Sequence, residues 1–303
     1  MPSAISSIPN PVLPRPSGTM RGVHRFGLIA STVLVAVLLA GCGVKSEPTT
    51  SSVAFPSHGI DAVGHQITLV TPPTRIVSFD SGATAILHDL GLANVTVAPT
   101  AATLAAEVAK STTSLVIVPS TLDPQLLQTI THATTAPVYL YGANPLSTAP
   151  STITQLGLVV GKGPEAAAIA KAVAASLTAL TAQLATEPNV RVLLEGRGFT
   201  AYGPATPAGL AVSAAGGTNV VTTDQPLNLS DVAALTIGAW VSLQPGGSTL
   251  ASLQSYPELA AVPAVKDARI VPLPKNGYPI DAALPAALRA LADDLHAAAV
   301  TTE

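Results

Sequence analysis

The sequence predicts an α/β protein with two lobes of similar plan, joined by one long helix. That helix is expected over Pro164–Leu184, an alanine-rich run with no glycine and no further proline. Proline suits a first helical position, and Glu165 favours the positive end of the helix dipole. At 1.5 Å per residue the helix would span roughly 30 Å, about the width of a small domain. The alternative is a single sheet with one more helix covering it.

The segment before this helix, residues 58–162, predicts the first lobe. It opens with a hairpin or edge strand over Asp61–Leu69. Short apolar strands and helices then alternate, which is typical of a parallel sheet covered on both faces. The expected strands are Ile76–Phe79, Val95–Ala98, Leu115–Val118 and Val138–Tyr141, and the expected helices are Ser81–Gly91, Leu104–Ala109, one capped by Asp123, and Leu146–Leu156.

The same rhythm returns after the connecting segment 163–187, so residues 188–303 predict a second lobe. Each lobe should therefore have three layers around a mainly parallel sheet. Trp240 lies inside an apolar strand, which favours a core position over a ligand contact. The expected strands are Val190–Leu194, Val220-Val221, Ala239–Leu243 and Ala268–Val271, and the expected helices are Thr206–Ala215, a turn at Asp231, Tyr256–Ala260 and Ala282–Ala299.

The amino terminus has the pattern of an export signal. A basic stretch, Met20–Arg25, precedes the 14-residue apolar run Phe26–Leu39, which is too short to span a bilayer. The run ends in Leu39-Ala40-Gly41-Cys42, which resembles the lipobox of bacterial lipoproteins and contains the only cysteine of the chain. Residues 1–41 are thus a predicted signal peptide, with translation starting at Met20, and residues 42–57 a lipidated flexible tether. The alternative is a structural cysteine behind a membrane anchor.

Charge and motifs exclude several classes of function. From Cys42 onward 11 basic residues face 17 acidic ones, a net charge of −6, which is unsuited to nucleic acid. The chain has no Walker A loop, Cys-x-x-Cys or His-Glu-x-x-His motif. The turn Phe79–Gly82 follows a strand as a hydrolase nucleophile does, yet it lacks Gly-x-Ser-x-Gly. The six histidines are scattered, so neither an enzyme nor a metal site is expected.

Several motifs in order resemble one known family. They are Asp61-x-x-Gly64, Pro73-x-Arg75-Ile-Val-Ser78, Leu87-x-x-Leu90-Gly91-Leu92, Gly203-Pro-x-Thr-x-x-Gly209-Leu and Ala215-Gly-Gly-Thr-Asn219. The family comprises the substrate-binding lipoproteins of ABC importers for ferric siderophores, haem and cobalamin. The resemblance implies two lobes joined by a rigid helix, a permease and its ATPase as partners, and a monomer anchored only by lipid to the outer face of the cytoplasmic membrane.

The resemblance also implies a ligand site between the lobes, in loops at the carboxyl ends of the strands. A tyrosine there could stack on a flat ligand or coordinate iron as a phenolate, and a cation could pair with a negative chelate. Ordinary loop positions are the alternative for each residue. The candidate ligand-binding residues are Asp80, Tyr141, Arg197, Tyr202, Lys275 and Tyr278.

Two acids are candidates for docking onto the permease, because members of the family typically carry one on the rim of each lobe. They are Glu107 and Asp231. The alternatives are a solvated helix face for Glu107 and a helix N-cap for Asp231.

The resulting hypothesis is a lipid-anchored solute-binding protein of an ABC importer that catalyses no reaction and has no resident cofactor. Its expected ligand is an iron complex, with a ferric siderophore first, haem second and cobalamin third. A non-transport exported lipoprotein and an esterase are the alternatives from other classes.

Overall fold

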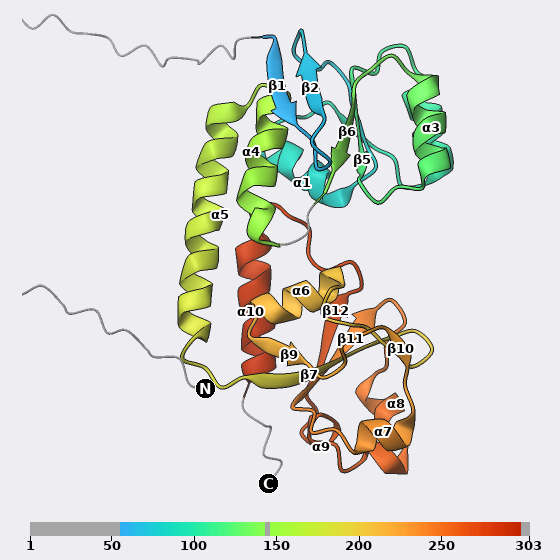
Figure 1. Ribbon diagram of the computed structural model, residues 1–303, viewed down its shortest axis with the longest axis vertical. Helices are drawn as coiled ribbons and strands as arrows, with labels where there is room; N and C mark the ends of the chain where they lie inside the picture. Colours follow the sequence, from blue (N-terminus) through green and yellow to red (C-terminus); the bar gives the residue numbers. More distant parts are fainter. Residues whose placement is uncertain (1–54, 143–145, 298–303) are drawn as a thin grey trace, which may run out of the picture. The chain divides into compact units, whose positions relative to one another are not determined.

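The computed structural model describes residues 55–142 and 146–297 of the protein. The predicted signal peptide, the start at Met20, Cys42 and nearly all of the tether lie outside these residues. So do residues 143–145, which follow the predicted strand Val138–Tyr141, and the last two residues of the predicted closing helix. Within the described part, the predicted α/β fold with two mainly parallel sheets is confirmed (Figure 1).

The first lobe is a four-stranded parallel sheet with a hairpin beside it. The sheet order is β4-β3-β5-β6, and the hairpin pairs β1 with β2 antiparallel. The strands are β1 (Ser57–Ile60), β2 (Gln66–Leu69), β3 (Ile76–Ser78), β4 (Val95–Val97), β5 (Leu115–Pro119) and β6 (Val138–Tyr141). The helices are α1 (Ser81–Asp89), α2 (Ala101–Val108), α3 (Pro124–Ala133), the 3₁₀ turn η1 (Leu146–Thr148) and α4 (Ala149–Val159).

Successive strand residues enter opposite layers of this lobe, because side chains alternate across a sheet. Ile76 lies in the core on the side of α1 and α4, whereas its neighbour Val77 packs with Leu104 of α2 and Ile130 of α3. Asp123 accepts backbone hydrogen bonds at the start of α3, as predicted for a helix cap. The lobe therefore has three layers.

The second lobe contains a six-stranded sheet in the order β10-β8-β7-β11-β12, with β9 also pairing with β7. The strands are β7 (Val190–Gly196), β8 (Thr200–Ala201), β9 (Gly217–Asn219), β10 (Gln225–Pro226), β11 (Ala239–Gln244) and β12 (Ile270–Pro274). The helices are α6 (Pro207–Ala214), α7 (Leu229–Ala233), α8 (Leu250–Gln254), the 3₁₀ turn η2 (Pro257–Leu259), α9 (Pro263–Lys266) and α10 (Leu284–His296).

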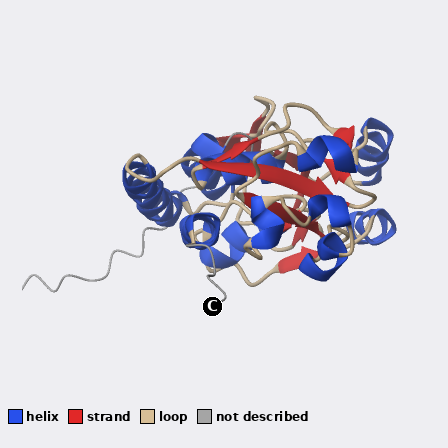
Figure 2. Cartoon of the chain, turned by 90° about the horizontal axis from the view of Figure 1, so that it is seen from below, coloured by secondary structure: helices blue, strands red, loops and turns tan. Residues whose placement is uncertain are grey.

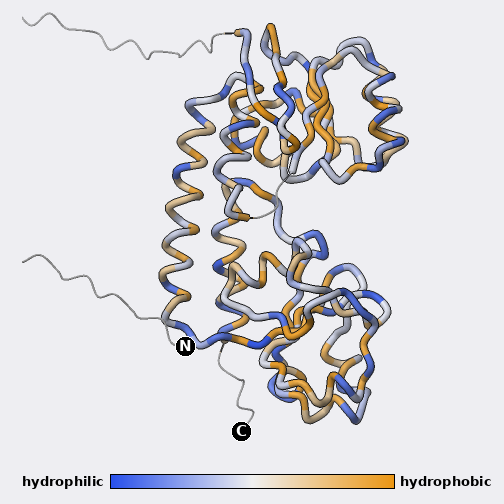
Figure 3. Tube along the Cα trace, viewed as in Figure 1, coloured by the Kyte–Doolittle hydropathy of each residue, from blue (hydrophilic) through white to orange (hydrophobic). Residues whose placement is uncertain are grey.

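Helices also cover both faces of this second sheet (Figure 2). Val241 packs on the side of α6 and α10, and the neighbouring Trp240 packs on the side of α7, α8 and α9. Trp240 has no exposed surface, so its predicted core position is confirmed. The hydrophobic segments in Figure 3 follow the strands of both sheets.

One strand prediction was wrong. Val220-Val221 was expected as a strand, but the strand in this region is β9, which ends at Asn219. The Asn219 side chain accepts from the Val221 amide and donates to the Tyr202 carbonyl. The Val220 amide still donates to the Val192 carbonyl of β7, whereas the Val221 amide bonds to the Asn219 side chain, so the ladder ends before Val221.

The predicted long helix is α5 (Gly163–Leu184), and it packs against both lobes. Its buried residues belong to the same continuous core as strands of both sheets. Arg289 of α10 donates a 2.6 Å hydrogen bond to the Gln183 side chain near the end of α5. Among the described residues, α5 alone has the length and hydropathy of a membrane-crossing helix, a property that core helices share.

Candidate functional site

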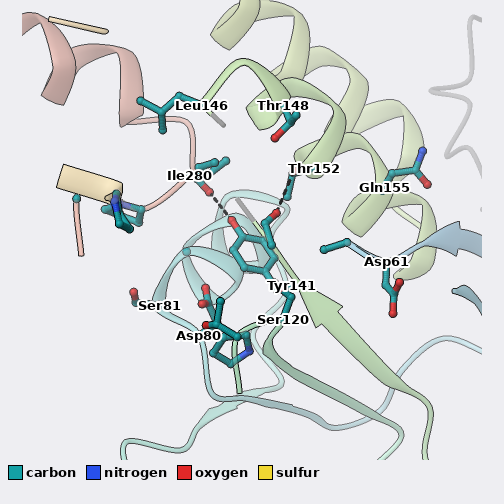
Figure 4. Close-up of a pocket in the computed structure, with 18 of the residues that line it drawn as sticks. Asp61, Asp80, Ser81, Ser120, Tyr141, Leu146, Thr148, Thr152, Gln155 and Ile280 are labelled. Carbon is teal, nitrogen blue, oxygen red and sulfur yellow. Dashed lines mark hydrogen bonds between the residues drawn. The ribbon is translucent and has the colours of Figure 1, made fainter. Parts of the chain in front are cut away.

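A cavity of about 710 Å³ is lined by both lobes. The first lobe contributes the β1–β2 turn, the β3–α1 loop, the ends of β5 and β6, and the start of α4. The second lobe contributes the β12–α10 loop and Pro207. Loops at the carboxyl ends of parallel strands are the usual place for ligands in open α/β sheets. The cavity is therefore the candidate binding site (Figure 4).

Asp80 reaches the cavity from the loop after β3. Its Oδ1 accepts a 2.9 Å hydrogen bond from the Ala83 amide and so caps α1. Burial raises the pKa of the Asp80 carboxyl, and the backbone hydrogen bonds from Ala83 and Gly82 offset only part of that effect. Asp80 is thus a predicted site residue that the structure places on the cavity wall.

Asp61 is also a lining residue of the cavity, and it was not among the predicted ligand-binding residues. It sits in the β1–β2 turn, where its Oδ1 accepts from the amides of Val63 and His65. Its side chain has no exposed surface. The other oxygen, Oδ2, makes no hydrogen bond and lies 3.3 Å from His65 Nδ1.

Two buried tyrosines form part of the wall. Tyr141, a predicted ligand residue, is 4% exposed, and its hydroxyl donates to the Ile280 carbonyl of the second lobe at 3.2 Å. Burial, followed by the nearby charge of Asp80, raises the pKa of Tyr141. Burial and Asp61 likewise raise the pKa of Tyr139, which was not predicted. Both phenols therefore stay neutral at physiological pH, and Tyr141 joins the lobes instead of presenting an open stacking face.

The β12–α10 loop contacts the first lobe at two points. Besides the Tyr141 bond, the Ala282 amide donates to Asp89 Oδ2 at the end of α1. A Cβ atom at Gly82 would lie 3.0 Å from the Tyr141 hydroxyl and 3.3 Å from the Ile280 amide. Glycine at position 82 therefore permits the close approach of the two lobes beside the cavity.

The other predicted ligand residues of the second lobe divide into two groups. Tyr278 lines the cavity, and burial raises its pKa. Lys275 instead places its ammonium 5.1 Å from the centre of the Tyr202 ring, a cation–π distance, and neither residue lines the cavity. Arg197 is exposed in the turn after β7 and also lies outside the lining. The cavity thus unites Asp80, Tyr141 and Tyr278 but excludes both predicted cations.

The two predicted docking acids have different surroundings. Glu107 on α2 pairs with Arg75 and with Lys110, and hydrogen bonding to Lys110 is the main reason that the Glu107 pKa is lowered. Asp231 is exposed in the first turn of α7. The alternative that Asp231 caps this helix is wrong, because the N-cap is Asn228, whose side chain accepts from the Ser230 amide.

A further carboxylate, Glu195, is buried in the second lobe away from the cavity lining. It is 1% exposed and accepts from the Ser248 amide, the Ser248 hydroxyl and Trp240 Nε1. Burial is the main cause of its raised pKa. Glu195 thus fixes the loop after β11 at some electrostatic cost.

Glu195→Gln should flatten the pH dependence of stability. Because the folded-state pKa lies above the ordinary 4.5, the native protein binds more protons than the unfolded chain as pH rises above that value. The free energy of unfolding of the wild-type protein should therefore fall as the pH rises above 4.5 towards the folded-state pKa of Glu195. The Glu195→Gln variant should lack this fall, while its glutamine side chain keeps the hydrogen bonds to Ser248. Urea unfolding at several pH values measures the difference, and identical pH profiles would contradict it.

Among the described residues, no group of three or more His, Cys, Asp or Glu side chains is arranged to hold a metal ion.

No protein-family model and no curated protein sequence matches the chain. Solved structures do resemble it. A periplasmic heme-binding protein from Pseudomonas aeruginosa is 21% identical with a TM-score of 0.63, covering 75% of this chain and 94% of that one. The periplasmic heme-binding protein RhuT from Roseiflexus sp. RS-1 is 20% identical with a TM-score of 0.62, covering 73% and 97%.

A structure described as an ABC transporter solute-binding protein, from Sulfurospirillum deleyianum DSM 6946, is also similar. It is 15% identical with a TM-score of 0.64, covering 80% of this chain and 90% of that one. At these identities the resemblance concerns the fold. The chain therefore has the two-lobe fold of periplasmic solute-binding proteins.

Proposed function

We propose that this chain is the ligand-capturing component of an ABC importer and that it catalyses no reaction. The observation that carries this proposal is the cavity lined by both lobes at the carboxyl ends of parallel strands, in a fold shared with periplasmic solute-binding proteins. A binding protein of this kind holds its ligand non-covalently and releases it to a permease and its ATPase.

We further propose that the protein is exported and lipidated at Cys42, so that residues 42–57 tether it to the outer face of the cytoplasmic membrane. The lipobox supports this proposal, as do the exported proteins that share the fold. A monomer would suffice, because one chain contributes both walls of the cavity.

An iron complex is the ligand class that the sequence resemblance favours, with a ferric siderophore ahead of haem and cobalamin. The heme-binding descriptions of the similar structures support haem as the leading alternative. An esterase has less support, because no histidine is among the described residues that line the cavity with Ser81.

Mass spectrometry of the protein purified from its own host, under conditions that preserve complexes, tests the function directly. We expect a stoichiometric small molecule that dissociates on denaturation. Isothermal titration calorimetry with a ferric siderophore, haem, cobalamin and Mn²⁺ then gives affinities. Trp240 fluorescence is a poor reporter, because this side chain does not line the cavity. An empty protein that binds none of these compounds, or turnover of ester substrates, would contradict the proposal.

Asp231→Ala should reduce uptake several-fold without changing ligand affinity. Its charge is exposed and outside the cavity, and a rim charge mainly affects the rate and orientation of docking. Because Asp231 is not the helix cap, the free energy of unfolding should change by no more than about 0.5 kcal/mol. Glu107→Ala should have a smaller effect on uptake, because Arg75 and Lys110 already neutralise that acid.

Uptake of radiolabelled ligand by cells expressing each variant measures this difference. Asp293→Ala, which removes an exposed acid on α10, is the control. Equal uptake by wild type, Asp231→Ala and Asp293→Ala would exclude Asp231 from docking.

A further inference from the structure

Among the described residues that line the cavity, the charged side chains are all negative. Asp61 and Asp80 are the two carboxylates, and no lysine, arginine or histidine is among the lining residues that the structure describes. In Figure 4 they are drawn on either side of Tyr141. The other polar groups of the wall are neutral hydroxyls and amides, including those of Ser120, Thr152 and Gln155.

One oxygen of the Asp61 carboxylate has no hydrogen-bond donor among the described residues. The turn uses Oδ1, whereas Oδ2 is buried without a hydrogen bond. The adjacent imidazole of His65 is mostly exposed, so it can reach water instead of this oxygen. A buried acceptor without a donor is unfavourable, and a donor on a ligand would remove that penalty.

Asp80 lacks a compensating cation as well. The groups that act on its pKa are backbone amides, and their effect is smaller than that of burial. Its Oδ1 is held by the helix cap, which fixes the carboxylate at the cavity wall. A positive group on a ligand would therefore find Asp80 without a cation beside it, and Asp61 with only the largely exposed imidazole of His65 nearby.

A negatively charged ligand would find no positive side chain among the described residues that line the cavity. The cations that the sequence suggested for it, Arg197 and Lys275, are outside the lining, and Lys275 lies over the Tyr202 ring. The phenols of Tyr139 and Tyr141 offer hydrogen bonds but no positive charge. Placing like charges together in an interface is strongly unfavourable.

We propose that the cavity selects a ligand with no net negative charge, one that presents an ammonium or similar donor group to Asp61 and Asp80. This inference rests on the proposed function and narrows its ligand class. A neutral or cationic chelate fits the cavity, whereas a chelate with several exposed carboxylates or catecholates does not. A free polyamine has the same donor chemistry without iron.

Three ferric chelates with one common metal centre isolate the effect of charge. Ferrioxamine B carries a pendant ammonium, its N-acetyl derivative is neutral, and its N-succinyl derivative carries a carboxylate. Calorimetric titration of the full-length protein should give the order ammonium, acetyl, succinyl, with about a tenfold loss in affinity at each step. Titration with spermidine shows whether a polyamine without iron is bound. Titration with haem shows whether a ligand with two carboxylates is bound. Tighter or equal binding of the succinyl derivative or of haem would overturn the inference.

Variants of the two acids connect the preference to the wall. Asparagine retains the acceptor that caps α1 or closes the β1–β2 turn, so Asp80→Asn and Asp61→Asn remove charge with little change of fold. Each substitution should weaken the binding of ferrioxamine B about tenfold, or the binding of spermidine if spermidine is the ligand that the protein binds. Each variant should bind the N-succinyl derivative no worse than the wild-type protein does. Asp123→Asn, at the cap of α3 outside the cavity, should leave every affinity unchanged. Unchanged affinities in all three variants would overturn the inference.

The ligand recovered from the host distinguishes this inference from the proposed function. A bound anionic chelate that is also imported would retain the function and overturn the charge selection. A neutral or cationic occupant supports both. Binding of none of the five probes to an empty host-purified protein would count against both.

Discussion

Gly157→Val should lower the free energy of unfolding by about 3 kcal/mol, because α4 and α5 touch at this glycine. A Cβ atom at position 157 would lie 2.1 Å from Ala166 Cβ and 3.2 Å from the Lys162 carbonyl. Both neighbours are fixed to the backbone, so neither can rotate away. In an exposed helix, replacing glycine by a larger residue usually stabilises the helix. The loss of stability expected for Gly157→Val therefore comes from the close packing of α4 against α5.

The same substitution should weaken ligand binding. The helix that it displaces, α4, supplies Ser151, Thr152 and Gln155 to the cavity wall. α4 and α5 also belong to the core that both lobes share. Separating α4 from α5 would therefore disturb the wall and the connection between the lobes together.

Urea unfolding followed by circular dichroism measures the stability change. Gly163→Ala is the matched control, because its Cβ would meet only the movable end of Leu158 at 3.1 Å. Combining the milder Gly157→Ala with Ala166→Gly should recover part of the stability that Gly157→Ala loses, as residues in contact couple. A Gly157→Val protein as stable as wild type would show that the helices are not in contact there.

The sequence was sufficient for the layered architecture, because the central strands and the long helix have local patterns, although the short helices α8 and α9 were not predicted. The apolar runs of the central strands and the uninterrupted helix α5 follow from composition and from the proline at its start. The two-residue strands β8 and β10 were missed, since polar pairs such as Gln225-Pro226 have no strand pattern and depend on their partners. The strand predicted at Val220-Val221 was wrong for the converse reason, because the Val221 amide bonds to the Asn219 side chain instead of to β7.

The predicted residues that line the cavity lie at or just beyond the carboxyl end of a strand. Asp80 is two residues beyond β3, Tyr141 is the last residue of β6, and Tyr278 is in the loop after β12. Asp61 was missed because its approach to the cavity depends on the hairpin docking on β6, where the Ala62 amide donates to the Leu140 carbonyl. The cations were misplaced because a strand end does not specify the direction of the side chain. Lys275 is next to the lining residue Asn276 and still lies over Tyr202.

Cys42→Ala should release the protein from the membrane almost completely. Each buried methylene of an acyl chain contributes about 0.8 kcal/mol to membrane binding, so loss of the acylation site removes the whole anchor. The described domain offers no clear substitute: α5 has the composition of a membrane span, but its buried face packs in the core shared by both lobes. Ligand affinity should be unchanged, because the cavity consists of residues 60–280.

Cell fractionation followed by immunoblotting measures the release, with a high-salt wash to remove proteins held by charge. Gly43→Ala, which changes the residue after Cys42, is the control and should remain in the membrane pellet. A second chain that begins at Met20 should be exported and anchored like the full sequence if translation starts there. Persistence of Cys42→Ala in the washed pellet at the wild-type level, with its signal peptide removed, would mean that something other than lipid at Cys42 holds the protein to the membrane.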